Sequence, residues 1–171
     1  MQLMEQEFGT TDGGSTWNNL ASTTNFEYVY DLIVRNEGGV IGVVYAAMRD
    51  VNGIDSDGTD LFRSEDGGVT WTVVSTESIR DLELASDNKI WAGNAEGSVF
   101  LSSDGITFTS KYTSSLPFLR RVELATAGSN ADVVYVLVAS QIEDSNRPGS
   151  FVTGLSEIVK TTDSGETWTN I

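Results

Sequence analysis

The chain contains the segment Ser64-Glu65-Asp66-Gly67-Gly68-Val69-Thr70-Trp71. Its pattern, a hydroxyl residue followed by Asp, Gly, Thr and an aromatic residue, occurs four times in the 171 residues. We call the copies repeat turns 1 to 4, and they lie at residues 10–17, 64–71, 102–108 and 161–168. A motif that returns four times indicates a repeat protein, so the fold has to be interpreted repeat by repeat.

Each repeat turn has the composition of a hairpin turn with the ends of its flanking strands. The Asp carboxylate is expected to accept hydrogen bonds from backbone N–H groups of its own turn, and the hydroxyl residue to do the same more weakly. The aromatic residue offers a large apolar face for burial. Repeat turn 3 is one residue shorter between its Asp and its aromatic residue, which predicts a slightly different turn.

The repeat turns resemble the Asp-box, or BNR repeat, of β-propellers in the sialidase, sortilin and xyloglucanase-like superfamily. In those families the box joins the third and fourth strands of a blade, on the face away from the ligand site, and its role is structural. The resemblance therefore implies structural roles for the box residues of this chain, which are Asp12, Trp17, Asp66, Trp71, Asp104, Phe108, Asp163 and Trp168. It also implies that a ligand would bind at the opposite face.

The spacing of the repeat turns matches propeller blades. Their Asp residues are 54, 38 and 59 positions apart (12 to 66, 66 to 104, and 104 to 163), and a four-stranded blade takes roughly 40–50 residues. We predict an all-β fold, a partial β-propeller of four-stranded antiparallel blades, with about three full blades and the C-terminal hairpin of a preceding blade. The expected parts of this single domain, 1–171, are a half-blade at 1–22 and blades at about 26–76, 77–114 and 116–171.

Three and a half blades do not close a ring, and unpaired sheet edges are a liability. We therefore expect the chain to be a fragment of a larger propeller, whose remaining blades come from the same chain or another one.

The composition excludes several kinds of site and partner. The net charge is −15, which argues against nucleic acid and anionic membranes, because both need a basic surface. The chain has no His and no Cys, so histidine-ligated metals, His-based triads, thiolate sites and disulfides are excluded. No apolar run is long enough to span a membrane and no signal peptide follows Met1, so no membrane insertion is expected.

Charged and aromatic residues recur near the start of the predicted innermost strands. These candidate ligand-binding residues are Tyr30, Asp31, Arg80, Asp81, Arg120 and Arg121. At the mouth of a propeller channel they would suit a carboxylated or hydroxylated ligand such as a sugar. The alternative is that these charges pair with neighbours across adjacent blades, since a repeated position commonly serves the repeat itself.

Two long insertions, 49–60 and 140–156, are predicted as loops on the face opposite the repeat turns, where binding is usual. The first suggests a calcium site, because closely spaced carboxylates and carbonyls suit Ca²⁺. Its candidate ligands are Asp50, Asn52, Asp55, Asp57 and Asp60. The EF-hand pattern fails, since Ile54 occupies a ligand position and no Glu closes the loop, so a polar surface loop is the alternative. Calcium is the one cofactor that the sequence suggests, and none is required.

The resemblance implies a noncatalytic recognition propeller that binds a glycan or an extracellular protein, in a secreted or cell-surface bacterial protein. One alternative is a sialidase-like or xyloglucanase-like glycoside hydrolase, with catalytic residues partly outside this segment. For that reaction Asp31 and Asp81 are the carboxylates on neighbouring blades, although no local motif supports them and the sialidase Arg-Ile-Pro signature is absent. The second alternative is a scaffold of the assembly-factor type, as in the photosystem II assembly factor that also carries Asp-boxes.

The calcium site predicts a metal-dependent stability. A site with an affinity typical of extracellular modules should raise the melting temperature by roughly 3–10 °C in 10 mM CaCl₂, because the ligand binds only the folded chain. Differential scanning fluorimetry with calcium, with magnesium and with EDTA measures this, and an Asp55→Asn/Asp57→Asn variant should lose the shift. An identical melting temperature in calcium and in EDTA rejects the site.

Overall fold

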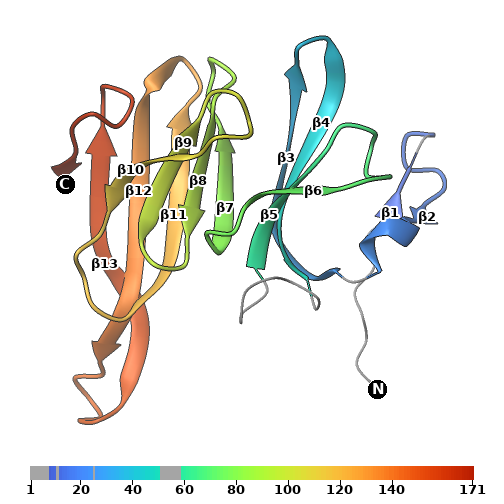
Figure 1. Ribbon diagram of the computed structural model, residues 1–171. Coiled ribbons are helices and arrows are strands. Elements are labelled where there is room, and N and C mark those ends of the chain that lie inside the picture. Colours follow the sequence, from blue (N-terminus) through green and yellow to red (C-terminus); the bar gives the residue numbers. More distant parts are fainter. Residues whose placement is uncertain (1–7, 11, 25, 51–58) are drawn as a thin grey trace. The chain divides into compact units, whose positions relative to one another are not determined.

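The computed structural model describes residues 8–10, 12–24, 26–50 and 59–171. The chain divides into two compact units, unit 1 (Met1–Ser78) and unit 2 (Ile79–Ile171). Both are built almost entirely from antiparallel strands (Figure 1). No helix among the described residues is long and apolar enough to cross a membrane.

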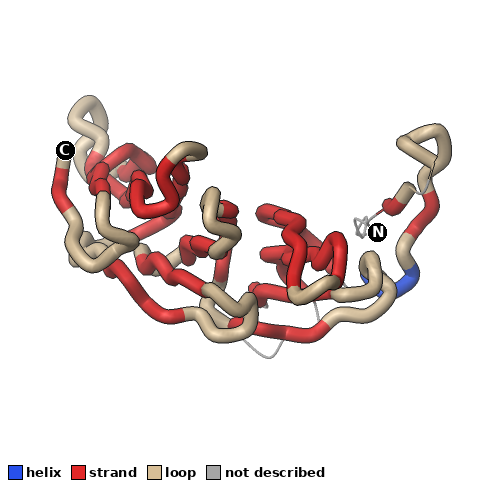
Figure 2. The backbone as a smooth tube through the Cα atoms, turned by 90° about the horizontal axis from the view of Figure 1, so that it is seen from above, coloured by secondary structure: helices blue, strands red, loops and turns tan. Residues whose placement is uncertain are grey.

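Unit 1 contains two sheets. The two-stranded sheet pairs β1 (Phe8–Gly9) with β2 (Asn18–Asn19), and the four-stranded sheet has the order β3-β4-β5-β6. The strands of the larger sheet are β3 (Phe26–Glu37), β4 (Val40–Asp50), β5 (Thr59–Ser64) and β6 (Thr72–Ser75). Figure 2 shows that one short 3-10 helix, η1 (Ala21–Thr23), interrupts the strands and loops of the described chain.

Unit 2 contains two four-stranded sheets with the orders β7-β8-β9-β10 and β11-β12-β13-β14. The strands of the first are β7 (Ile79–Leu84), β8 (Ile90–Asn94), β9 (Ser98–Ser102) and β10 (Thr109–Thr113). Those of the second are β11 (Leu119–Ala127), β12 (Asn130–Glu143), β13 (Phe151–Thr161) and β14 (Thr169–Asn170). Every strand pairs with the next one along the chain, so each sheet is a simple meander.

The predicted fold class is confirmed. The chain is all-β, with three four-stranded antiparallel sheets of the kind found in propeller blades and one two-stranded hairpin before them. Repeat turns 2, 3 and 4 join the third strand of a sheet to the fourth, and repeat turn 1 joins β1 to β2.

The prediction of a loop over residues 140–156 was wrong. Strand β12 continues to Glu143 and β13 begins at Phe151, so only residues 144–150 form the connection. The insertion instead lengthens the hairpin beyond the rest of the sheet, as the lower left of Figure 1 shows. Residues 140–143 and 151–154 pair with one another as antiparallel strands, and this pairing satisfies their backbone groups.

The core of unit 1 is an aromatic cluster on the four-stranded sheet. Phe26 lies 5.1 Å from Phe62 and 5.8 Å from Trp71 between ring centroids, the latter in an edge-to-face arrangement. Ala46 and Met48 complete the cluster, and both are fully buried. The aromatic residue of repeat turn 2 thus anchors the turn to the strands before it.

The core of unit 2 lies between its two sheets. Trp91 and Val99 from the first sheet pack against a set of valines from the second, which are Val122, Val134, Val136, Val138 and Val159. Trp168 of repeat turn 4 packs edge-on against Trp91, with ring centroids 6.2 Å apart, and lies 5.2 Å from Tyr112. One repeat turn of the second sheet is therefore anchored on the first sheet.

The close approach of the two sheets in unit 2 depends on Gly93 in β8. A Cβ atom at this position would lie 2.8 Å from Cγ1 of Val122, and a β-branched side chain has little freedom to move away. Gly128, in the turn between β11 and β12, provides the contrast, because a Cβ atom there would have no neighbouring atom within 4 Å.

Gly93→Ala should lower the free energy of unfolding by about 1–3 kcal/mol, because the added methyl group forces the sheets apart. Gly128→Ala should change it by about 0.5 kcal/mol or less, or stabilise slightly by restricting the unfolded chain. Urea titration followed by tryptophan fluorescence compares the two variants. Equal stabilities would show that the sheets of unit 2 do not pack at Gly93.

Candidate functional site

The repeat turns close on their own Asp carboxylate. In repeat turn 4, Oδ1 of Asp163 accepts a hydrogen bond from the backbone N–H of Thr167 (2.9 Å), and Oδ2 accepts one from its hydroxyl (2.6 Å). The hydroxyl of Thr161 donates to Oδ1 of Asp163 (2.7 Å) and accepts from the N–H of Gly165 (2.9 Å). Repeat turns 1 and 2 have the same four bonds.

Repeat turn 3 differs, as its length predicts. The backbone N–H of Thr107, three residues after Asp104, donates to Oδ1, whereas in the other turns the donor is four residues away. Likewise Gly105 donates to the hydroxyl of Ser102 over three residues instead of four. The deletion therefore shortens the turn by one residue and leaves its central carboxylate in place.

These hydrogen bonds keep the Asp carboxylates ionised. Bonds from the side chain and backbone of Thr167, and then from Thr161, lower the pKa of Asp163 from 3.8 to about 2. The equivalent Thr16 and Thr70 lower the pKa of Asp12 and of Asp66 to about 2. The backbone N–H groups of Thr107 and Ile106 lower the pKa of Asp104 as well.

The aromatic residues of the repeat turns are used unequally. Trp168 donates its indole N–H to the backbone oxygen of Lys111 in the neighbouring sheet (2.9 Å). Trp17 and Trp71 instead donate to a glycine of their own turn, Gly14 and Gly68. Trp17 is 60% exposed, so the expected burial of the aromatic face is not seen in repeat turn 1.

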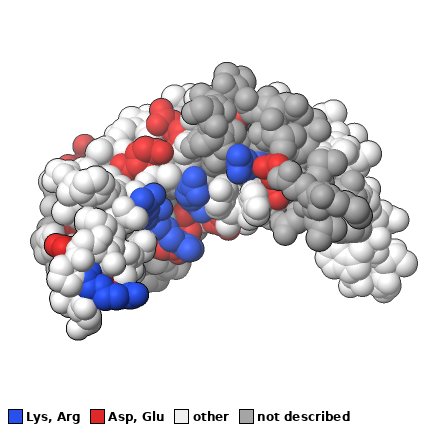
Figure 3. All heavy atoms as spheres, turned by 90° about the horizontal axis from the view of Figure 1, so that it is seen from below, with Lys and Arg blue, Asp and Glu red and all other residues white. Residues whose placement is uncertain are grey.

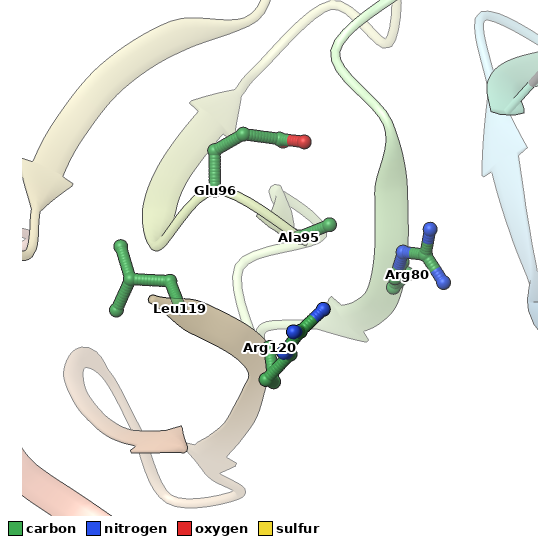
Figure 4. A pocket seen from close by; sticks show the side chains of 5 residues that line it. All are labelled: Arg80, Ala95, Glu96, Leu119 and Arg120. Atoms are coloured by element: carbon green, nitrogen blue, oxygen red, sulfur yellow. The ribbon is translucent and has the colours of Figure 1, made fainter. Parts of the chain in front are cut away.

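A hollow of about 610 Å³ lies at the other end of unit 2, where β7 and β11 begin. Its lining consists of Arg80 from β7, Ala95 and Glu96 from the loop after β8, and Leu119 and Arg120 from β11. Figure 4 shows the two arginines at its rim, with Glu96 across from them on the loop after β8. The hollow thus brings together Arg80 and Arg120, two of the six candidate ligand-binding residues, and their role in binding stays a prediction.

All four arginines of residues 79–171 lie at this end, on the strand starts and the β12–β13 connection: Arg80, Arg120, Arg121 and Arg147. Figure 3 shows the molecule from this side, with basic side chains gathered on the face. The three lysines of the same segment lie elsewhere, with Lys89 in the β7–β8 turn, Lys111 on β10 and Lys160 on β13. We call this arginine-rich surface the arginine end.

The arginines differ in what they contact. Arg120 is exposed and makes no hydrogen bond or ion pair with any described residue. Arg121 forms an ion pair with Glu123, and Arg147 one with Asp144 (3.0 Å). Arg80 is half-buried in β7. A ligand that binds at the hollow would therefore meet Arg120 first.

Asp81 contacts the neighbouring sheet. This contact fits the second interpretation of the repeated charged residues, in which they link adjacent blades. Its Oδ2 accepts a hydrogen bond from the backbone N–H of Leu124 in the next sheet (2.7 Å). Glu83, two residues further along β7, accepts one from the hydroxyl of Thr126 (3.3 Å). Both bonds tie the first strands of the two sheets together.

Tyr30 and Asp31 lie on β3 of unit 1, and a role for them in ligand binding stays a prediction. Tyr30 is exposed, and Oδ1 of Asp31 accepts a hydrogen bond from the backbone N–H of Leu32 (2.8 Å). A glycosidase would need Asp31 and Asp81 to act as a pair of carboxylates. Because Asp31 belongs to unit 1 and Asp81 to unit 2, this pair likewise stays a prediction.

The calcium candidates fall mostly outside the described residues. Asn52, Asp55 and Asp57 are not described, and of Asp50 only the backbone position at the end of β4 is given. Asp60 is a buried residue of β5. Among the described residues, no cluster of three or more acidic side chains is placed to hold a metal ion.

Unit 1 contains a cluster of charged side chains around Tyr45 that the sequence did not predict. Glu37 accepts hydrogen bonds from Tyr45, Arg35 and Arg63, and both arginines also lie over the Tyr45 ring. Burial opposes ionisation of Glu37, but the bonds from Tyr45 and the arginines outweigh it and lower its pKa, while burial and Glu37 raise the pKa of Tyr45 to about 12. Tyr45 is fully buried, so the cluster links β3, β4 and β5 from within the sheet. The signal was one Tyr, one Glu and two Arg on a single face of three paired strands.

Comparison with known proteins gives structural neighbours only. No family model and no curated protein matches the sequence. A solved structure described as YCF48 bound to D1 peptide is similar over 95% of this chain and 59% of its own, with 15% identity and a TM-score of 0.43. YCF48 from Cyanidioschyzon merolae is similar over 97% of this chain and 78% of its own, with 13% identity and a TM-score of 0.32. This chain thus spans 59% of the length of the first of these structures.

The lowered pKa values of the Asp residues predict acid lability. Each carboxylate is more acidic in the folded chain than in the unfolded one, so its contribution is fully present above about pH 4 and is lost as the pH falls from 3.8 toward 2. Thermal unfolding followed by circular dichroism between pH 2 and pH 6 measures this dependence. Asp163→Asn should flatten it, and Thr167→Val should move part of it to higher pH. An Asp163→Asn profile parallel to that of the native chain would contradict the assignment.

Proposed function

We propose that this chain is a noncatalytic recognition module that binds a polypeptide through a carboxylate, at the arginine end of unit 2. The observation that carries the proposal is the segregation of basic residues, since all four arginines of residues 79–171 lie at that end and two of them line a hollow. In a chain of net charge −15 this gathering of arginines stands out, and Arg121 and Arg147 are already paired with Glu123 and Asp144.

The choice of arginine supports a carboxylate ligand. A guanidinium group presents donors in a planar fork that matches a carboxylate with two parallel hydrogen bonds, whereas a lysine acts as a point charge. Arg120 has these donors open to solvent, and Glu96 on the opposite wall limits how many negative charges the hollow accepts. One carboxylate, from an acidic side chain or a chain terminus, is the ligand group that fits.

A second hollow, of about 400 Å³, supports this choice by contrast. It lies beside repeat turn 3 and is lined by Lys89 and Lys111 among others. Both lysines are already engaged, Lys89 with Asp87 and Lys111 with Glu166, each at 2.5 Å. An anion that bound there would have to break two ion pairs, whereas binding to Arg120 breaks none among the described residues.

The remaining lining favours a polypeptide over a glycan. Ala95 and Leu119 add apolar surface to the hollow, and no aromatic side chain of the described residues lines it. A peptide supplies the combination of a carboxylate and small apolar groups that this lining can contact. The carboxylates nearest to it on β7, Asp81 and Glu83, hold the two sheets together, which supports recognition over acid–base chemistry.

We also propose that the repeat turns are Asp-boxes and that the protein acts outside the cell or on its surface. The hydrogen bonds of Asp12, Asp66 and Asp163 support the first proposal, since they give the motif a turn-closing role. The second rests on the resemblance of the motif to secreted Asp-box proteins.

A peptide-binding measurement tests the function. Random dodecapeptides with free C-terminal carboxylates are screened against the chain, and affinities for the hits are measured by fluorescence anisotropy. Arg120→Gln should weaken binding by about 10- to 100-fold, because a charge-assisted hydrogen bond contributes about 1.5–3 kcal/mol. Lys89→Gln, which removes a charge from the opposite end, should change the affinity less than twofold.

Two comparisons make this test decisive. Binding should weaken as salt increases, and amidated or Gln-substituted versions of each hit should lose affinity to the same degree as the Arg120→Gln variant. Equal binding by Arg120→Gln and native chain would refute the site. Binding to a glycan array, with no peptide bound, would refute the ligand class.

A further inference from the structure

The hairpin β12–β13 extends beyond the four-stranded part of its sheet. β11 pairs with β12 as far as Ser140, and Gln141 donates its backbone N–H to the oxygen of Phe118. β14 pairs with Val159 and Lys160 of β13, and Ile171 donates its backbone N–H to the oxygen of Ile158. In the other sheet of unit 2, the fourth strand reaches Ser98, four residues before the hydroxyl residue of its repeat turn. Four residues before Thr161, the hydroxyl residue of repeat turn 4, the equivalent position of β13 is Glu157. A fourth strand as long as β10 would therefore end there and would not reach residues 151–155.

Within the described residues of unit 2, this part of β13 is an apolar edge strand without a neighbour on its outer side. Phe151, Val152 and Leu155 are 59%, 41% and 58% exposed. Apart from β12 on its inner side, no backbone group of the described residues donates to or accepts from Phe151–Leu155. The hydroxyl of Ser156 donates to the backbone oxygen of Gly154 (3.2 Å). Edge strands are normally protected from pairing by charged side chains, above all lysine, or by proline. Residues 151–155 contain neither.

The unpaired backbone determines what kind of group can cover the edge. Alternating N–H and C=O groups along an extended strand are satisfied by another extended strand, which adds to the sheet. A sugar, a helix or a metal ion would leave most of these groups unpaired. The occupant is therefore a β-strand.

The residues of the edge match a second copy of themselves. About Thr153, the order Phe151-Val152-Thr153-Gly154-Leu155 places apolar residues at equal distances on both sides. In an antiparallel pair centred on Thr153, Phe151 of each copy would lie opposite Leu155 of the other copy. The two Thr153 residues would lie opposite one another. These are aromatic–aliphatic and Thr–Thr pairs, which stabilise antiparallel sheets.

The other face of the ribbon fits the same register. Val152 would stand opposite Gly154 of the second copy, and Gly154 has no side chain to compete for the space. On its own chain Gly154 is already covered by Ile142, since a Cβ there would lie 2.9 Å from Cδ1 of that side chain. Ile142 and Val152, a directly opposed pair in the hairpin, would then form a continuous apolar strip with their counterparts.

We propose that two copies of this chain associate through the β13 edge, with Phe151–Leu155 paired antiparallel about a twofold axis at Thr153. A twofold, self-complementary contact of this kind closes after two copies. The pairing ends at Leu155 on each copy, so β14 keeps its place on Val159 and Lys160. The proposal uses none of the residues that line the hollow of the peptide site.

Charge gives the association a distinctive dependence on salt. Each copy carries a net charge of −15, so the two copies repel one another and screening should strengthen the dimer. Carboxylate binding to arginine should weaken under the same conditions. The two effects can therefore be separated in one protein sample.

Disulfide trapping tests the register. The chain has no Cys, so Thr153→Cys introduces a single thiol that faces its own counterpart across the twofold axis. In a glutathione redox buffer it should form a covalent dimer at least tenfold faster than Phe151→Cys, whose counterpart lies four residues, about 13 Å, along the strand. Phe151→Cys mixed with Leu155→Cys should give the mixed dimer. Equal rates for Thr153→Cys and Phe151→Cys would overturn the proposed register.

Analytical ultracentrifugation tests the association without a cross-link. The native chain should shift toward twice its 18.5 kDa mass between 5 and 200 μM, more strongly in 0.5 M NaCl than in 0.05 M NaCl. Thr153→Lys should remain monomeric, because it sets like charges opposite one another, and an unchanged melting temperature shows that it is folded. A monomeric native chain at 200 μM, or a dimer that Thr153→Lys leaves intact, overturns the proposal.

Discussion

The fold depends on a carboxylate that is satisfied within eight residues of chain. In repeat turn 4, Asp163 binds the N–H and the hydroxyl of Thr167, while Thr161 binds both Asp163 and Gly165. Because every partner lies in the same turn, the third and fourth strands are connected in one defined geometry in each sheet. The aromatic residue at the end of the turn is then directed to the strands that it anchors, as Trp168 is to Lys111 and Trp91.

Packing between the sheets of unit 2 combines this local order with close contact. Gly93 lets Val122 approach, and the carboxylates of Asp81 and Glu83 reach across to Leu124 and Thr126. A register shift in β7 separates two roles, since the pairing with β8 passes from Ile79 to Asp81 and skips Arg80. Asp81 binds the neighbouring sheet, while its neighbour Arg80 lines the hollow at the strand start. Structural and candidate binding residues are thus interleaved on one strand.

The sequence was sufficient for the strand order and for the shorter repeat turn 3, because both follow from residues close together in the chain. It was insufficient for Asp81 and Arg80, which were predicted as members of one ligand site. Which of them contacts the next sheet depends on residues more than 40 positions away, such as Leu124. The Glu37 cluster escaped for the same reason, since Tyr45 and Arg63 meet Glu37 only once three strands are paired. The loop predicted at 140–156 became strand because pairing satisfies the backbone of a segment whose composition alone was ambiguous.

By itself, the sequence determined the all-β class, the four turns and the excluded chemistries, since hydrogen bonds of the Asp and hydroxyl side chains act over three or four residues and missing residue types exclude sites outright. Only the tertiary structure decided which charges hold sheets together and which lie open. It also decided that the 140–156 insertion is a ribbon with an unpaired apolar edge. Those properties depend on strand register and on the distance between sheets. A shift of one residue in the pairing of a strand would move its side chains to the opposite face of the sheet.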